Sequence, residues 1–173
     1  MANQYPTFLV ALDESPLSDK VFEQALKIAS ENRGSLRILH CIEVKTWQNL
    51  SSMIDAGTGL SSRRLIEKKH ELAVENDLNR LNAWLHNLCN IAIVEGVDAD
   101  YKISLTGAPG PVICRTAQNF QVRAIIMGSN GKQAWQQFFL GSVSKYVTDN
   151  APCETIVVQS GEEANLYFPA AMS

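Results

Sequence analysis

Residues 122–158 read VRAIIMGSNGKQAWQQFFLGSVSKYVTDNAPCETIVV, and this stretch decides the fold class. One apolar run extends from Val122 to Met127 and a second, shorter one from Thr155 to Val158. Short apolar runs that are rich in β-branched residues and bounded by turn residues are typical of buried strands. Between them lie glycine-rich turns and a helix expected from Val143 to about Asn150. The stretch therefore predicts a strand–helix–strand unit with two parallel strands.

The same alternation of strand and helix runs through the rest of the chain. Further strands are predicted at 7–12, at 35–42 and around 101–105, and a long helix at about 63–88. Ser15 is expected to cap the helix after the first strand, with Pro16 at its first position. This order predicts an α/β fold, an open sheet of five parallel strands with helices on both faces.

Composition and charge narrow the class of protein. The chain has 173 residues, of which 46% are hydrophobic and 19% charged, and its net charge is -3. These values predict one globular domain over residues 1–160, with a surface loop insertion at 46–62 and a C-terminal tail at 161–173. The charge gives no reason to expect nucleic acid. The absence of a membrane-spanning run or an export signal in the sequence predicts a cytoplasmic location.

Cysteines and histidines show no metal-binding spacing. The four cysteines form no C-x-x-C pair and are expected to be reduced, mostly buried thiols (Cys41, Cys89, Cys114 and Cys153). The three histidines form no cluster along the sequence. No metal site made by protein side chains is predicted.

Glycines mark the predicted ligand end of the sheet. In parallel sheets ligands bind beyond the carboxyl ends of the strands, and Gly128 and Gly131 follow the strand that ends at Met127. A residue without Cβ lets phosphate or ribose oxygens approach the backbone. Gly141 precedes the last helix, with Ser142 expected at its N-cap. The N–H groups at such a helix start favour an anion, and the hydroxyls of Ser142 and Ser144 could add donors.

The chain resembles the universal stress protein family. The resemblance rests on the pattern of glycine, two residues, glycine, nine residues, glycine, serine, which Gly128, Gly131, Gly141 and Ser142 supply. Flanking segments match as well, including Ile126 to Ser129 and the stretch from Leu140 to Cys153. The first strand followed by Asp13 and Ser15, the pair Leu39-His40 and the pair Gly107-x-Pro109 agree too. The resemblance extends from Tyr5 to Gln159.

The resemblance implies a three-layer, Rossmann-like fold of the adenine nucleotide alpha hydrolase type and often a homodimer. A complete glycine pattern implies the ATP-binding branch of the family, acting in the stress response. By similarity, Asp13 lies near the ribose and adenine, the backbone of Cys41 holds the adenine edge, and Ala11 lines the same slot. The other residues expected at the nucleotide follow the fourth strand or begin the last helix: Met127, Gly128, Gly131, Gly141, Ser142, Val143 and Ser144. A divalent cation, Mg²⁺, would neutralise the phosphate oxygens.

Two positions at the starts of the last two predicted strands depart from the family pattern. Arg123 stands just before the fourth strand, where an acidic residue is common, and Glu154 enters the last strand. If the edge of that strand pairs two subunits, Glu154 would weaken or redirect the pairing.

Three functions remain open from the sequence. The favoured interpretation is a nucleotide-binding regulatory module with little or no turnover, because no nucleophile has an evident base partner along the chain. An enzyme, either a slow ATPase or a nucleotide-dependent phosphotransferase, is the alternative. It would need Asp13 or Glu14 near the γ-phosphate, and a Walker A motif is absent from the sequence. A nucleotide-free interaction module is the third. Asp13 on its own could equally be a turn residue that accepts local N–H groups.

Overall fold

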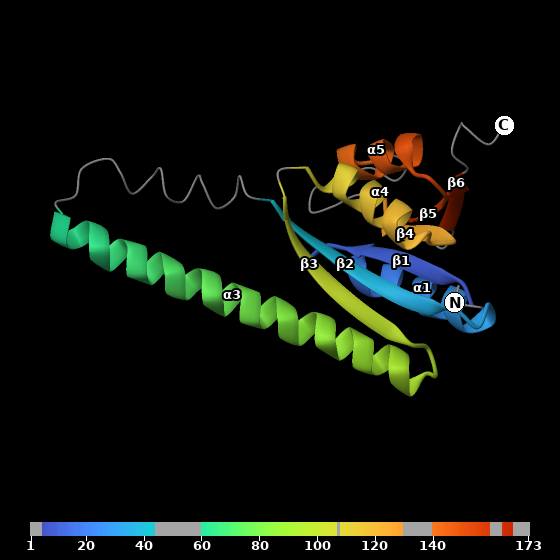
Figure 1. The fold of residues 1–173 in the computed structure, drawn as a ribbon, viewed down its shortest axis with the longest axis horizontal. Helices are drawn as coiled ribbons and strands as arrows, with labels where there is room; N and C mark the ends of the chain where they lie inside the picture. The colour runs from blue at the N-terminus through green and yellow to red at the C-terminus, as the bar shows by residue number, and fades with distance from the viewer. Residues whose placement is uncertain (1–4, 44–59, 107, 130–139, 160–163, 168–173) are drawn as a thin grey trace.

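The computed structural model describes the backbone of residues 5–43, 60–106, 108–129, 140–159 and 164–167. Strands and helices alternate along these segments (Figure 1). In chain order they are β1 (Thr7–Leu12), α1 (Ser18–Glu31), β2 (Ser35–Glu43), α3 (Leu60–Val94), β3 (Ala99–Thr106), α4 (Pro109–Phe120), β4 (Ala124–Gly128), α5 (Ser142–Asn150), β5 (Glu154–Val158) and β6 (Ala164–Tyr167).

The strands form one sheet in the order β3-β2-β1-β4-β5-β6. The first five are parallel, which confirms the predicted five-stranded parallel sheet. The sequence prediction missed β6, which pairs antiparallel with β5 from Thr155–Tyr167 to Val158–Ala164. A four-residue strand carries too little periodicity to be recognised within a tail. Both sides of β5 are therefore paired, so the edge predicted for a second subunit is occupied by the chain itself.

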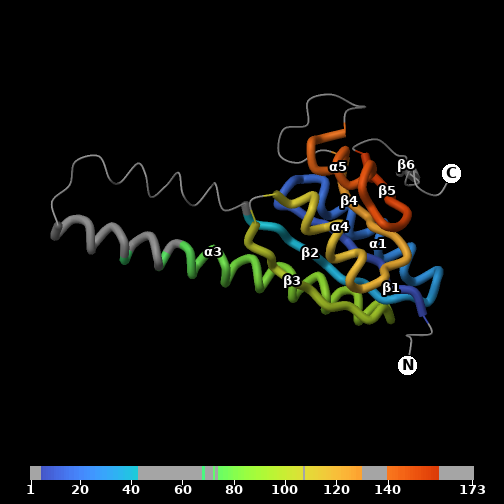
Figure 2. The backbone as a smooth tube through the Cα atoms, turned by 45° about the horizontal axis from the view of Figure 1, so that its top comes forward, coloured from blue at the N-terminus to red at the C-terminus, as the bar shows by residue number. Residues whose placement is uncertain are grey.

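Helices cover both faces of the sheet (Figure 2), and a separate hydrophobic core on each face makes the fold three-layered. The α1–α3 core contains side chains of α1 and α3, together with Phe8, Val10 and Ile126 from the strands. The α4–α5 core contains side chains of α4 and α5, together with Leu9, Ile125 and Val157. Because successive strand side chains point to opposite faces, neighbours in sequence belong to different cores.

Helix α3 is longer than predicted, and only part of it packs on the sheet. Leu81, Leu85 and Leu88 are buried, whereas Leu72 on the same predicted apolar stripe is 50% exposed. The N-terminal end of α3 lies away from the sheet (Figure 1). Residues 60–62 of the predicted loop insertion are its first residues, and residues 44–59 lie outside the described segments. No helix in the described segments has both the length and the apolarity needed to cross a bilayer.

The start of α1 differs from the prediction that Ser15 caps it. The helix begins at Ser18, and Leu17 holds the N-cap position without a side-chain bond. Ser15 and Pro16 instead form a preceding turn, in which Ser18 N–H donates to Ser15 O at 3.1 Å. Asp13 explains the difference, because its Oδ1 accepts the N–H of Ser15 at 3.0 Å. The Asp13 carboxylate therefore bonds the backbone of this turn, and the Ser15 hydroxyl does not cap the helix.

Candidate functional site

The predicted site lies at the point where the sheet changes winding direction. From β1 the chain moves outward to β2 and β3, and it returns to the other side of β1 with β4. Ala11 on β1 lies directly opposite Met127 on β4. Asp13 follows the end of β1 and Gly128 ends β4, so both lie at the carboxyl ends of these two strands. This is the place at which open α/β sheets bind ligands.

Four predicted site residues gather on one face of the sheet there. Met127 belongs to the α4–α5 core, and Ala11, Cys41 and Val143 are partly buried against the same core. They come from β1, β2, β4 and α5, so residues more than a hundred positions apart in the sequence lie on a common face.

Ser129 joins the end of β4 to the start of α5. Its carbonyl accepts the N–H of Gly141 at 2.7 Å and the hydroxyl of Ser144 at 2.7 Å. Its own N–H donates to Val158 O of β5 at 2.8 Å. Ser129 is 4% exposed. The sequence interpretation did not include it among the site residues, although its place between the two glycines was a signal for a constrained backbone.

The bonds of the Ser129 carbonyl fix the position of the N-terminus of α5. Gly141 holds the N-cap with an extended backbone, so the prediction that Ser142 caps the helix is wrong by one residue. Helical bonding begins with Lys145 N–H to Gly141 O at 2.9 Å, which places the N–H groups of Ser142, Val143 and Ser144 ahead of the helical ladder. Such groups, with the positive end of the helix dipole, suit an anion.

The hydroxyl of Ser144 has a structural role within this turn. It donates to Ser129 O, and Gly141 O lies 3.1 Å away. Ser144 is 2% exposed. Any contact of Ser144 with a phosphate would therefore use its backbone N–H rather than its side chain, whereas Ser142 is exposed.

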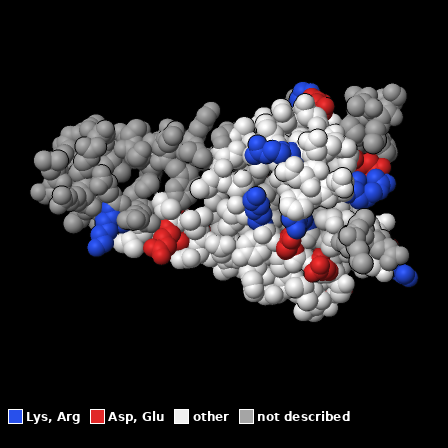
Figure 3. Space-filling view, in the orientation of Figure 1, with Lys and Arg blue, Asp and Glu red and all other residues white. Residues whose placement is uncertain are grey.

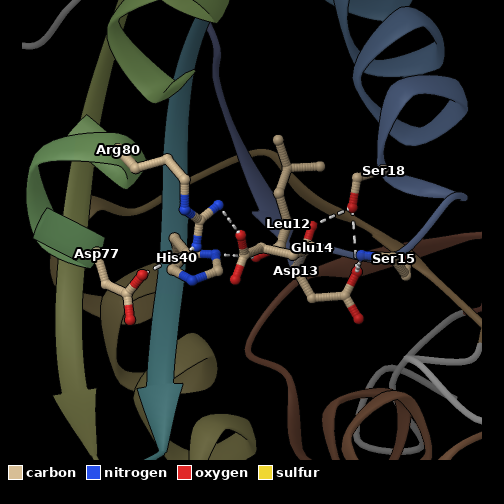
Figure 4. A network of polar contacts seen from close by, with 8 residues as sticks. All are labelled: Leu12, Asp13, Glu14, Ser15, Ser18, His40, Asp77 and Arg80. Atoms are coloured by element: carbon tan, nitrogen blue, oxygen red, sulfur yellow. Dashed lines mark hydrogen bonds and ion pairs between the residues drawn. The ribbon is translucent and has the colours of Figure 1, made fainter. Parts of the chain in front are cut away.

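Asp13 and Glu14 both make side-chain bonds on the loop between β1 and α1 (Figure 4). Asp13 Oδ1 accepts the N–H of Ser15 and, at 3.0 Å, the hydroxyl of Ser18. Glu14 forms an ion pair with Arg80 of α3. The turn bond of Asp13 is compatible with a contact to a nucleotide, because the bond occupies one carboxylate oxygen and the side chain is half-buried at the strand end.

Glycine at position 128 has a reason that the sequence did not indicate. A Cβ built there would lie 3.0 Å from Leu17 Cδ2 and 3.6 Å from Val21 Cγ2. It would therefore point toward α1 and away from the α4–α5 face. Space for Leu17 is thus one cause of this glycine, beside any close approach of a ligand to the backbone. Gly131 lies outside the described segments.

Cys41 is suited to packing. Burial raises the pKa of its thiol to about 11, because the thiolate is poorly solvated among apolar neighbours. The thiol is therefore neutral near pH 7 and unreactive as a nucleophile. This agrees with a contact made by the backbone of Cys41. Among the residues the structure describes, no group of three or more His, Cys, Asp or Glu could hold a metal ion.

Charged residues are dispersed on the face of the molecule seen in Figure 3. Lysine, arginine, aspartate and glutamate side chains lie apart from one another or in opposite-charge pairs over the described part of that face. It therefore carries no extended field of a single sign.

Comparison with known proteins identifies the family. The model of the universal stress protein family matches residues 4–159. The universal stress protein Sll1388 of Synechocystis is 30% identical over 159 residues, which cover 90% of this chain and 98% of that protein. The chain therefore belongs to the universal stress protein family, as its resemblance implied.

Solved structures share the fold. A universal stress protein in complex with cAMP has a TM-score of 0.60 and 17% identity, with coverage of 92% of this chain and 100% of that one. The universal stress protein of Archaeoglobus fulgidus in complex with dAMP has a TM-score of 0.54 and 18% identity, with coverage of 88% and 97%. These similarities confirm the Rossmann-like architecture.

Proposed function

We propose that this chain binds an adenine nucleotide, ATP with Mg²⁺, and serves as a cytoplasmic regulatory module of the stress response with little or no turnover. One observation carries the proposal. The β1–β4 switch point brings Ala11, Met127 and Cys41 together on the face that also holds the start of α5. Apolar residues suit the adenine base, and the N–H groups of a helix start suit the phosphates. That two structures of the same fold are complexes with cAMP and dAMP supports an adenine nucleotide.

The low turnover is supported by the state of the two candidate bases. The sequence offered Asp13 and Glu14 as residues that could activate a water or a hydroxyl. Asp13 is bonded to Ser15 and Ser18, and Glu14 is paired with Arg80. Both carboxylates are therefore already engaged in local contacts, which does not favour either of them as a general base. A slow ATPase or phosphotransferase remains the alternative and would be recognised by multiple turnovers.

Calorimetric titration with ATP, ADP and AMP, with and without Mg²⁺, tests the proposal. The wild type should bind at least one of these nucleotides, and Ala11→Leu should not, because the larger side chain would fill the base slot. The same substitution at exposed Ala83 of α3 is the matched control and should bind normally. Asp13→Asn keeps an oxygen for the Ser15 turn, and should bind more weakly while remaining folded.

A wild type that binds no adenine nucleotide would overturn the proposal and favour the nucleotide-free interaction module. The predicted glycine contact is tested separately by Gly131→Val, which should weaken binding if phosphate approaches the backbone at that residue. Steady release of ADP over many turnovers would instead support the enzymatic alternative.

We also propose that the chain forms a homodimer, and the pairing of β6 with β5 limits which surfaces could form the interface. Because β6 pairs with β5, a second copy would approach the outer edge of β6 or another surface unless β6 is displaced. Sedimentation of the full chain and of a chain ending at Gln159 tests this. Stronger self-association of the shortened chain is expected, since an uncovered strand edge promotes pairing. The same oligomeric state for both chains would contradict a role for this edge.

A further inference from the structure

Helix α3 contacts the loop that carries Asp13 through two residues one helical turn apart. Arg80 donates from Nη1 to Glu14 Oε1 (Figure 4), and Trp84 meets the ring of His40 edge-on, with ring centroids 5.9 Å apart. Residues four apart in a helix lie on the same face, so both contacts are made by one side of α3. That side faces the ends of β1 and β2.

His40 transmits the Trp84 contact to the main chain of β1. Its Nδ1 lies 3.0 Å from Leu12 O, and a carbonyl only accepts, so Nδ1 carries the proton in this bond. His40 is 5% exposed and lies opposite Leu12 in the strand register. The bond therefore fixes the residue directly before Asp13, while the Arg80 pair fixes the residue directly after it.

Helix α1 holds the same loop from the other side. Ser18 donates its hydroxyl to Asp13 Oδ1 and to Asp13 O. Asp13 consequently stands between a backbone anchor at Leu12, a side-chain anchor at Glu14 and the start of α1. Its direction at the strand end is determined by contacts that lie on the α1–α3 face, away from Ala11 and Met127.

We propose that α3 sets the direction of Asp13 in the nucleotide site and that Arg80 is a positioning residue for this site. The inference rests on the proposed nucleotide binding and deepens it, because it makes nucleotide affinity depend on a helix that extends beyond the sheet. Thermodynamic reciprocity requires that a bound nucleotide in turn stabilises the contact of α3 with the loop.

Arg80→Gln is the principal test, and Arg123→Gln is its matched control. The Arg80 and Arg123 side chains are 57% and 58% exposed, and they pair with Glu14 and Glu154, whose side chains are 31% and 24% exposed. Arg80 Nη2 also lies 3.8 Å from Asp77 Oδ1 on the same helix. Arg123 pairs with Glu154 at 2.8 Å, at the amino ends of the strands and away from the site. Affinity should fall about two- to fivefold in Arg80→Gln, the range of an exposed ion pair, and stay unchanged in Arg123→Gln. Urea unfolding should change equally in both.

Two further variants separate positioning from a general loss of stability. Arg80→Lys keeps the charge and should restore most of the affinity. Combining Arg80→Gln with Glu14→Gln should weaken binding by less than the sum of the two single changes, because the two substitutions share the Arg80–Glu14 contact. Equal nucleotide affinities of Arg80→Gln and Arg123→Gln would overturn the inference.

Amide hydrogen exchange measured on the nucleotide-free chain gives a readout that does not depend on binding. The N–H of Ser15 is bonded to Asp13 Oδ1, so looser positioning should accelerate its exchange in Arg80→Gln and leave Arg123→Gln like the wild type. Unchanged exchange at Ser15 would contradict the role of Arg80. If the wild type binds no adenine nucleotide, the proposed function fails, and this exchange comparison still decides whether α3 positions the loop.

Discussion

On the α4–α5 face of the sheet, Ala11 and Cys41 lie against an apolar core at the predicted base slot, whereas on the α1–α3 face their neighbours Leu12 and His40 bond to each other beneath α3. Strand alternation produces this division, because consecutive residues point to opposite faces. The predicted base slot therefore lies on one face, and the contacts that hold the loop beyond the strands lie on the other. The comparison teaches that a residue can matter to this site without facing it.

The largest expected effect comes from removing core volume on each face separately. Ile125 and Ile126 are adjacent on β4, both 0% exposed, and they belong to the α4–α5 core and the α1–α3 core respectively. Substituting either by alanine should lower the free energy of unfolding by about 2–5 kcal/mol, measured by urea unfolding. Nucleotide affinity should fall more in Ile125→Ala, which shares a face with Met127. Equal losses of affinity would mean that the faces are not separate in function.

Two buried threonines on the α4–α5 side of the sheet allow a second test, with an expected change of about 1 kcal/mol in the free energy of unfolding. Thr155 is 1% exposed and its hydroxyl has no hydrogen-bond partner among the described residues. Thr155→Val should therefore raise the free energy of unfolding by about 1 kcal/mol, because an unsatisfied polar group is removed with little change of shape. Thr116 donates to Val112 O at 2.8 Å, so Thr116→Val is the control and should not stabilise. A destabilised Thr155→Val would indicate a bonded hydroxyl.

The last expected effect appears only above about pH 9 and concerns alkaline stability. Burial raises the pKa of both Cys41 and Cys153 to about 11 from the model-compound value of 9.0. The folded chain therefore retains these protons at a pH where the unfolded chain has lost them, and stability should fall as the pH rises from about 9 to 11. A variant with both cysteines replaced by alanine should show a shallower decline in urea unfolding. An identical decline in the variant and the wild type would show that other ionisable groups cause the loss of stability.

The sequence predicted the parallel sheet because the sheet depends on strong local signals, and the candidate site at the ends of β1 and β4 was inferred from signals of the same kind. The apolar runs of β1 and β4 and the glycines after Met127 are visible without any tertiary contact. The roles of Ser129 and Arg80 depend on partners far along the chain, Val158 in one case and Glu14 in the other. The N-cap of α1 was misplaced because the Asp13 carboxylate bonds the turn that Ser15 was expected to cap. The N-cap of α5 was misplaced because Gly141 holds that position without any side-chain bond.

The exposure of Arg80 and Glu14 has a consequence for the conditions under which the site operates. An ion pair whose side chains are 57% and 31% exposed is screened by dissolved salt, over a Debye length of about 8 Å at physiological ionic strength. A site that depends on this pair should bind its nucleotide less tightly as salt accumulates, and Arg80→Gln should lose part of that dependence. A change in the salt concentration of the surrounding solution would then reach the proposed nucleotide site through one exposed pair of charges.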